Sequence, residues 1–527
     1  MLSKRWLRLS VSLIALIILA IVLITYANSP EYVQPYLDAI IKQAPSPDYF
    51  APDTNFYVID IAIRDCGKWN KNSPTCGVPS VSYGEGTPQK DTDMNWQRVT
   101  KDFYLNKHWT ALRYLSYKRA SEHDNVIVDI AIGASPGQGW RSKGHGIWVK
   151  YGKPLKDKAI TGIDLLFGED AVEPRQNWKL IDTPLDGSYD FPIKLTYHRG
   201  QTTGREVKQL QFDQDGKLKI LQVADLHFLT GVGVCRDPVP AELAEGCQAD
   251  PRTVRFLESI LDIEKPDFVV LTGDQIYGDE APESESAIFK ALNPFIKRKI
   301  PFAVTMGNHD HQGLLSRTQV MQLSLLLPYS LSETGPSHIP GAGNYVLTVK
   351  SSKDDKPAAT FYFVDTHAYL TQPRIALGYD WIKDEQLEYL LANKVELLLG
   401  MAFLHIPLPE YRNVANNELI GQNPETVTAP RYNTHARSRF AAWGVQVVTC
   451  GHDHANDYCL KDRQPDENDV WLCYGGGAGE GGYGGYNGYV RRVRLFELSE
   501  NDKSIKTWKR REDNPSQLFD HQVLYQA

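Results

Sequence analysis

The sequence lacks an excess of positive charge. Its 527 residues include 57 lysines and arginines against 64 aspartates and glutamates, which gives a formal net charge of −7 and an isoelectric point near 6.1. Such a chain has no basic field to attract a nucleic acid, so we expect no nucleic-acid partner. Any anionic ligand must be attracted locally, for example by bound metal ions.

Cysteine is also scarce, and none of the seven cysteines follows the C-x₂-C spacing of a zinc module. Three pairs each bracket a polar loop: Cys66 with Cys76, Cys235 with Cys247, and Cys459 with Cys473. Such pairs suit disulfide bonds in an oxidising compartment, and free thiols in a reducing compartment are the alternative. Cys450 ends an apolar run and is expected to be a thiol in the core.

Charge is absent from Leu9 to Pro30, after a basic flank, and this run is long enough to span a bilayer. We predict a transmembrane signal-anchor within residues 1–30, with the basic flank in the cytoplasm and the remaining chain lumenal or extracellular. A cleaved signal peptide, the alternative, would need a shorter apolar region and a small-residue cleavage site. We therefore expect a single-pass membrane protein of the secretory or vacuolar system, although the sequence has no Asn-X-Ser/Thr glycosylation acceptor.

Residues 31–205 are predicted to form a β-rich N-terminal module of unknown role, because short β-prone runs alternate with glycine, proline and aspartate turns. Residues 133–137 within it have the form G-x-S-x-G. Pro136 follows the candidate nucleophile Ser135 and has no N–H for an oxyanion, and no helical pattern comes after it. We therefore interpret this motif as a turn and not as a hydrolase nucleophile elbow.

Residues 206–527 have a different pattern and are predicted to form a second domain. Apolar strands alternate there with helical segments near residues 253–265 and 285–299. Five of the apolar runs lead into polar residues: Asp225, Asp274, Asn308, His405 and His452. In α/β sheets, ligands bind beyond the carboxyl ends of the strands. We therefore expect these five strand ends to converge on one site.

The polar residues at these strand ends are nitrogen and oxygen donors of the kind that bind metal ions. Side chains at i and i+2 of an extended segment point to the same side, so Asp225 and His227 can aim two donors into one cavity, as can His452 and His454. One ion needs three or four donors, so the set predicts two ions, which a carboxylate can bridge at about 3.5–4 Å. Such a pair suits phosphate-ester hydrolysis because it neutralises both the attacking and the leaving oxygen.

The ordered blocks D-x-H, G-D, G-N-H-D, H and G-H-x-H resemble the calcineurin-like metallophosphoesterase superfamily over roughly residues 217–495. Within them, "VADLHF", "PDFVVLTGDQIYG" and "GHDHANDYC" look like the fungal and plant group related to purple acid phosphatases. The resemblance implies an α/β metallophosphoesterase β-sandwich flanked by helices, which here would follow the β-rich module and the transmembrane helix. It also implies a metallophosphatase.

The resemblance further implies two ligand sets bridged by Asp274: Asp225, His227 and His454 for one ion, and Asn308, His405 and His452 for the other. A hydroxide shared by the ions would attack phosphorus in line, without a covalent phosphoenzyme. His309 is the expected proton donor to the leaving alkoxide, oriented by Asp310 or another nearby acid. Three further histidines are interpreted as loop residues, with contact to a substrate phosphate as the alternative: His311, His367 and His435.

Tyr277 marks a departure from the purple acid phosphatases. It completes their G-D-x-x-Y block, but those enzymes have D-x-G in the first block, where this chain has His227. Tyrosinate and imidazole ligation would compete for similar space, so we interpret Tyr277 as a packing aromatic, with metal ligation as the alternative. The sequence does not distinguish among iron, manganese and zinc as the metal.

Residues 474–492 are rich in glycine but lack the G-x-x-x-x-G-K-[ST] pattern of a nucleotide-binding P-loop. We expect a flexible rim whose backbone comes close to the site. Arg491 and Arg492 at its end are expected to be solvated surface charges, with contact to a substrate phosphate as the alternative.

Together these patterns predict a membrane-anchored binuclear metallophosphatase that acts on phosphomonoesters, with Ser/Thr phosphoproteins as a candidate substrate class. A phosphodiesterase with the same metal core is the second interpretation. A non-catalytic, membrane-tethered interaction protein is the third, and the complete set of metal donors weakens it.

Overall fold

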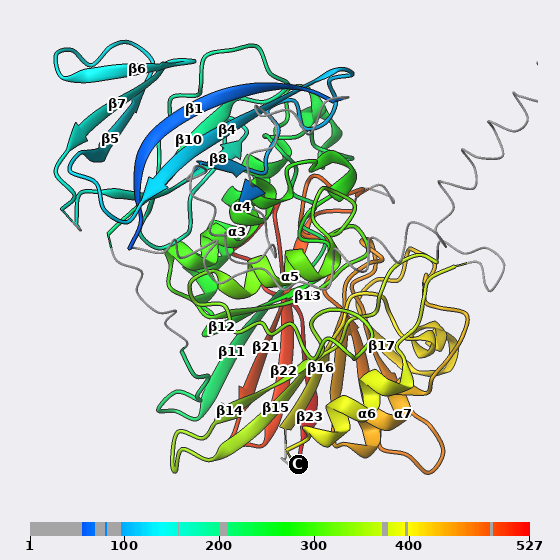
Figure 1. Cartoon of the computed structure of the whole chain (residues 1–527). Coiled ribbons are helices and arrows are strands. Elements are labelled where there is room, and N and C mark those ends of the chain that lie inside the picture. The colour runs from blue at the N-terminus through cyan, green and yellow to red at the C-terminus, as the bar shows by residue number, and fades with distance from the viewer. Residues whose placement is uncertain are drawn as a thin grey trace, which may run out of the picture.

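The computed structural model describes residues 55–68, 80–81, 96–155, 157–200, 208–370, 378–395, 399–484 and 489–527. In this part of the chain two large sheets pack face to face, with helices on their outer faces, and three small sheets precede them (Figure 1).

The first large sheet has the strand order β13-β12-β11-β21-β22-β23. Its strands are β11 (Lys217–Val223), β12 (Phe268–Thr272), β13 (Phe302–Thr305), β21 (Arg492–Ser499), β22 (Ser504–Arg511) and β23 (Phe519–Gln526). The first three run parallel, because helices α3 (Ala249–Glu264) and α4 (Ser284–Lys297) provide the crossovers between them. The other three are antiparallel. Both predicted helical segments are therefore confirmed, and α4 continues through Pro294.

The second large sheet has the order β14-β15-β16-β18-β20-β19-β17. Its strands are β14 (Tyr345–Lys350), β15 (Pro357–Phe363), β16 (Leu399–Phe403), β17 (Glu418–Ile420), β18 (Val447–Cys450), β19 (Cys459–Asp462) and β20 (Val470–Tyr474). The central strands β15, β16, β18 and β20 are parallel. The remaining α-helices are α5 (Arg317–Leu326), α6 (Asp384–Ala392) and α7 (Ala436–Ala442), and the 3-10 helices are η2 (Ala241–Ala244), η3 (Gly278–Glu280), η4 (Pro409–Arg412) and η5 (Val414–Asn416).

Alternation along each parallel strand explains why two layers of core form. In β12, Phe268 and Val270 face the second sheet, whereas Val269 and Leu271 pack under the helices. The inner layer also contains Phe361 and other buried residues of the second sheet, and burying one such side chain stabilises the fold by about 1.5–3 kcal/mol. Helices α6 and α7 cover the opposite outer face. The predicted β-sandwich flanked by helices is confirmed.

The described residues between 55 and 200 form three small sheets, which we call the β module. Its strands are β1 (Tyr57–Gly67), β2 (Ser80–Val81), β3 (Trp96–Val99), β4 (Ala111–Ala120), β5 (Val126–Ile132), β6 (Trp140–Gly144), β7 (Ile147–Gly152), β8 (Ile160–Phe167), β9 (Trp178–Leu180) and β10 (Ile193–Arg199). All described strand pairs except β2–β3 are antiparallel. Ser135 lies in the connection from β5 to β6, in agreement with the predicted turn.

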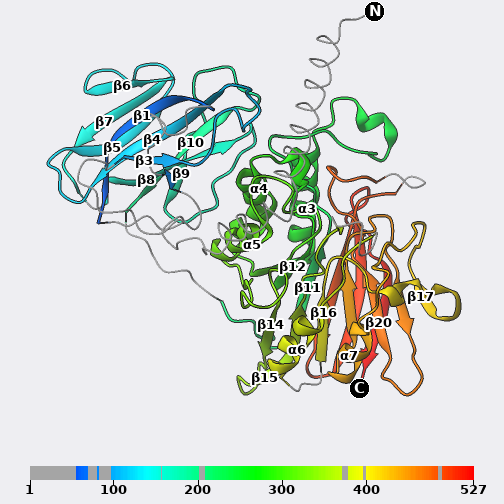
Figure 2. The ribbon, with the colours of Figure 1, turned by 45° about the vertical axis from the view of Figure 1, so that its right-hand side comes forward.

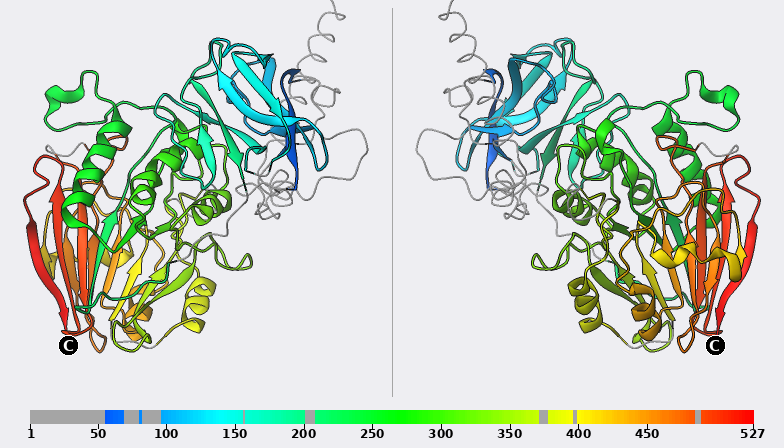
Figure 3. Two further views of the ribbon diagram at one scale, coloured as in Figure 1. Left: turned by 90° about the vertical axis from the view of Figure 1, so that its left-hand side faces the viewer. Right: turned by 90° about the vertical axis from the view of Figure 1, so that its right-hand side faces the viewer.

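The β module packs against helix α4, at the end of the molecule opposite the C-terminus (Figures 2 and 3). Five buried charged side chains form what we call the interface charge cluster: Lys101, Asp164, Arg175, Glu283 and Glu285. Lys101 Nζ lies 2.9 Å from Glu285 Oε2 and 3.2 Å from Asp164 Oδ1. The three carboxylates of this cluster, together with Glu173 bound to Arg175, outnumber the two cations. Burial and the charge of Asp164 raise the pKa of Glu285 to about 8.

The structure corrects the predicted localisation. No helix among the described residues is both long enough and apolar enough to cross a bilayer, which contradicts the expected single-pass membrane protein. The predicted transmembrane segment, residues 9–30, lies outside the described residues.

Two of the three cysteine pairs form disulfide bonds, Cys235 with Cys247 and Cys459 with Cys473. Cys66 also takes part in a disulfide, but its expected partner at position 76 lies outside the described residues. Cys450 is a buried free thiol, as predicted.

Candidate metal centre

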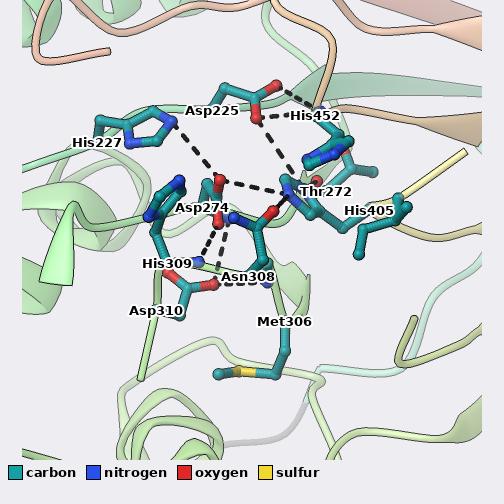
Figure 4. A network of polar contacts seen from close by, with 12 residues as sticks. Asp225, His227, Thr272, Asp274, Met306, Asn308, His309, Asp310, His405 and His452 are labelled. Atoms are coloured by element: carbon teal, nitrogen blue, oxygen red, sulfur yellow. Dashed lines mark hydrogen bonds and ion pairs between the residues drawn. The ribbon is translucent and has the colours of Figure 1, made fainter. Parts of the chain in front are cut away.

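Polar side chains gather where the parallel strands of the two large sheets end (Figure 4). Asp225, Asp274, His405 and His452 each stand two residues beyond the end of a strand, and Asn308 stands three residues beyond β13. Strands β11, β12 and β13 supply one half of the site, and β16 and β18 supply the other. The expected convergence of five strand ends is therefore what the structure shows.

The first group of metal donors consists of Asp225, His227 and His454, all buried, with one ligand atom of each within 4.8 Å of the others. His227 Nε2 lies 3.1 Å from His454 Nε2, and His454 Nε2 lies 3.5 Å from Asp225 Oδ1. Donors about 2 Å from a shared ion are separated by roughly these distances.

The second group consists of Asp274, His405 and His452, again with ligand atoms within 4.8 Å of one another. The amide oxygen of Asn308 lies 3.0 Å from His405 Nε2 and adds a fourth donor. Asp274 Oδ2 is 3.3 Å from His405 Nε2 and 3.6 Å from His227 Nε2, so its carboxylate faces both groups. This is the position that a bridging ligand requires.

The hydrogen bonds of the imidazole rings show that these donors fit cations. His405 Nδ1 donates to the carbonyl oxygen of Thr272 at 2.9 Å, and His454 Nδ1 donates to that of Tyr483 at 2.7 Å. In the neutral rings the Nε2 atoms are then acceptors, as in many metal sites. The Nε2 of His405 faces only other acceptors, the oxygens of Asn308 and Asp274. Among the described residues, buried His452 Nε2 has no hydrogen-bond partner. A cation satisfies all of these atoms.

The pKa values in the metal-free chain also indicate that the site binds cations. Burial lowers the pKa of His227 to about 3 and the pKa values of His452 and His454 well below the ordinary value, so these rings are neutral ligands. Burial also raises the pKa of Asp225 well above its ordinary value. Burial opposes protonation of His405, but the carboxylate of Asp274 outweighs it and raises the pKa of His405 to about 9, so in the metal-free chain a proton on Nε2 takes the place that a cation would take beside Asp274. The carboxylates of this site therefore need a positive partner.

Left-handed backbone brings several of these ligands into place. Asp225, His227, Asp274 and His452 have φ angles of 54°, 49°, 51° and 81°. Residues other than glycine rarely adopt this conformation, and such strain concentrates at functional sites. Asp225 and His227 were predicted to point to the same side because their segment would be extended. Both side chains do reach the same donor group, but the backbone between them is not extended, so the stated reason was wrong.

His309 lies beside the first group, with its ring centroid 5.4 Å from that of His227. Its Nδ1 is 2.6 Å from Gln312 Oε1, so the side chain of Gln312 orients the ring. Asp310, the predicted orienting acid, instead accepts hydrogen bonds from Gly307 N at 2.7 Å and Ile276 N at 3.1 Å. It holds the loops that carry Asp274 and Asn308 and makes no hydrogen bond to the His309 ring among the described contacts. This role of Gln312 was not predicted. Its short spacing from His309 is the only signal for it in the sequence.

The glycine-rich segment approaches the metal donors closely, as predicted for its described part. A Cβ at Gly482 would lie 2.6 Å from His454 Cε1 and 2.7 Å from His227 Cδ2, so only glycine fits there without displacing the rings. The ring of Tyr483 stacks on that of His454 at a centroid distance of 3.9 Å, and its hydroxyl donates to Glu425 at 2.5 Å. Neither Tyr483 nor Glu425 was predicted, because no local sequence pattern distinguishes them.

Arg491 and Arg492 are both buried, so the expectation of solvated surface charges was wrong. Arg491 donates to the carbonyl oxygens of Gly482 at 2.7 Å and Tyr483 at 2.8 Å. Arg492 forms an ion pair with Asp457. Arg491 therefore fixes the glycine-rich segment against the metal donors, and neither guanidinium is free for substrate.

Tyr277 packs its ring edge-on against His309 and His227, at centroid distances of 5.0 and 5.5 Å, in agreement with its predicted packing role. Three other histidines, His311, His367 and His435, lie outside both donor groups. His311 is near Arg317, His367 hydrogen-bonds Gln386, and His435 precedes α7.

This chain is similar to a known protein family and to several known proteins. Residues 218–456 match the family described as calcineurin-like phosphoesterase. The chain is 44% identical over 393 residues to "Phosphatase DCR2" of Saccharomyces cerevisiae, covering 70% of this chain and 67% of that protein. It is 35% identical over 353 residues to "Probable inactive purple acid phosphatase 29" of Arabidopsis thaliana, covering 60% and 88%. The structure of a purple acid phosphatase from yellow lupin aligns with a TM-score of 0.40 at 12% identity, covering 91% of this chain and 74% of that one.

Proposed function

The chain belongs to the calcineurin-like phosphoesterase family and is a metallophosphatase, and on that premise we propose that it hydrolyses phosphomonoesters, with Ser/Thr phosphoproteins as the substrate class. The observation that carries the proposal is the position of Asp274, whose carboxylate lies within 3.6 Å of a histidine from each donor group. Asp274 would thus help to hold two cations, and such a pair would suit the transfer of a phosphoryl group to water.

When bound, two ions of iron, manganese or zinc supply neutralisation of the phosphate charge and lower the pKa of water. The chain's own residues do the remaining work. The carbonyl oxygens of Thr272 and Tyr483 fix the tautomers of His405 and His454, so that their Nε2 atoms are the donors. His309 Nδ1–H donates to Gln312 Oε1, so the second proton of the imidazolium form sits on Nε2, and this is the proton that His309 would donate to the leaving oxygen.

The test is hydrolysis of p-nitrophenyl phosphate by the purified chain, before and after chelation and after return of manganese, iron or zinc. We expect metal-restored turnover in the wild type and a loss of at least a thousandfold in Asp274→Asn, because the neutral amide no longer balances two cations. Metal content, measured by mass spectrometry, shows whether the variant binds fewer ions.

Bis(p-nitrophenyl) phosphate is measured in parallel. Faster turnover of this diester than of the monoester would replace the proposal with a phosphodiesterase. A folded, metal-loaded chain that hydrolyses neither compound would refute the catalytic proposal.

A further inference from the structure

Beside the metal centre lies a cleft of about 910 Å³ that hydrolysis of a small phosphomonoester does not use. We call it the module cleft, because the β module forms one wall with Lys107, Glu169, Asp190 and Phe191. The other wall consists of the two loops that leave the metal centre after His227 and after Tyr277, and it includes Val234 and Arg236.

Tyr277 connects the cleft to the metal centre. The guanidinium of Arg236 lies over the Tyr277 ring, 4.6 Å from its centroid. The same ring is 5.0 Å from the ring of His309. A substrate whose phosphate occupies the metal centre and whose remaining part extends past Tyr277 therefore enters the module cleft.

The charge of the cleft selects against anionic substrates. Four exposed carboxylates face two cations, and two of these carboxylates are already paired, Asp190 with Lys107 at 3.6 Å and Glu280 with Arg236. Within the described part of the chain, Glu169 and Asp279 have no ion-pair partner. The two remaining negative charges attract cationic groups and repel phosphate groups that do not reach the metal ions.

The cleft also offers apolar surface. Val234 on one wall is 71% exposed, and the ring of Phe191 on the other wall is half-buried. A volume of this size with mixed apolar and acidic walls exceeds what a small phosphomonoester fills. A polypeptide supplies both apolar and basic side chains around a phosphorylated residue.

We propose that the module cleft binds the polypeptide that flanks a phosphorylated residue and that it selects basic side chains next to that residue. This inference rests on the proposed phosphatase function and adds the surface that distinguishes a phosphoprotein from a small ester. The cleft is built into the fold, because the interface charge cluster and a hydrogen bond from Phe167 N to Ser286 Oγ of 2.8 Å hold the β module on α4. A preformed cleft of this kind needs little ordering to bind a peptide.

The experiment compares two phosphoserine peptides of equal length, one with arginine and one with glutamate on both sides of the phosphoserine. For the metal-loaded chain at low ionic strength we expect kcat/KM about tenfold higher for the arginine peptide, with the preference shrinking at high salt. The double variant Glu169→Lys with Asp279→Lys is expected to abolish or reverse the preference. Glu122→Lys with Asp124→Lys makes the same charge change on an exposed turn of the β module outside the cleft and is expected to keep it.

Fluorescence anisotropy with labelled versions of both peptides measures the same preference without turnover. Equal affinities for the two peptides, or an equal loss of preference in the control variant, would overturn the module cleft as a peptide site. Failure to hydrolyse p-nitrophenyl phosphate would instead refute the proposed phosphatase function. A peptide preference in anisotropy would then still support the cleft, so the two failures are distinguishable.

Discussion

Gly482→Ala tests the metal centre most directly, because it adds one methyl group against two donors at once. The new Cβ would lie 2.6 Å from His454 Cε1 and 2.7 Å from His227 Cδ2. These distances are shorter than an ordinary carbon contact by about 0.8 Å, so at least one ring must move by that amount. His454 cannot move freely, because its Nδ1 donates to Tyr483 and its ring stacks on the same residue.

A displacement near 1 Å at a catalytic group costs about a hundredfold in rate. We therefore expect kcat/KM for p-nitrophenyl phosphate to fall about a hundredfold, which corresponds to about 2.7 kcal/mol of transition-state stabilisation. Affinity for the ion of the first donor group should fall about 10- to 100-fold, because that group loses its alignment. Excess metal should restore part of the activity.

The assay combines steady-state kinetics, a metal titration and thermal unfolding. Gly67→Ala is the matched control, because a Cβ at that position meets no atom of the described residues within 4 Å and should change neither kinetics nor metal content. Wild-type turnover and wild-type metal affinity in Gly482→Ala would refute the close approach of this backbone to the metal donors. Loss of the folded state in the variant would show in circular dichroism and is separable from loss of metal.

Three further predictions follow from the same contacts. Gln312→Leu should lower kcat for an alkyl phosphate by about 10- to 100-fold but less for p-nitrophenyl phosphate, whose leaving group needs no proton; equal losses would contradict the orienting role. Glu285 has its pKa raised from 4.5 to about 8, so the folded wild type binds the proton more tightly and loses stability as the pH rises from 5 to 8. Glu285→Gln should flatten the dependence of Tm on pH over that range, and parallel Tm curves would count against the buried cluster. Chelation should lower Tm, because Asp225 and Asp274 then lose their positive partner, and return of metal should restore it; an unchanged Tm would argue against resident ions.

The sequence by itself determined the strands and the residue types at their ends. Runs such as "FVVLT" are apolar on both faces, and that pattern is local, so it predicts buried parallel strands without knowledge of their neighbours. The polar residue two or three positions beyond each strand is equally local. Because parallel strands present their carboxyl ends at one edge, the donor set that includes Asp274 and His405 could be predicted before any contact was known.

Tertiary structure alone decided which of these residues meet and how their rings are held. Asp225 and His454 are more than 200 residues apart in sequence, and their approach depends on how the two sheets pack. The left-handed φ of Asp225 is imposed by the surrounding loops and has no signature in the chain. Whether Gln312 or Asp310 orients His309 depends on the direction that each side chain takes within one turn, which composition does not encode.

The burial of Arg491 likewise could not be predicted from the sequence. Two adjacent arginines after a glycine-rich segment look like surface charges, because arginine is expensive to bury without partners. The fold supplies those partners as backbone carbonyl oxygens of Gly482 and Tyr483, which local patterns could not reveal. Charge type and spacing were therefore readable from the sequence, whereas burial and pairing depended on contacts between segments that only the folded chain brings together.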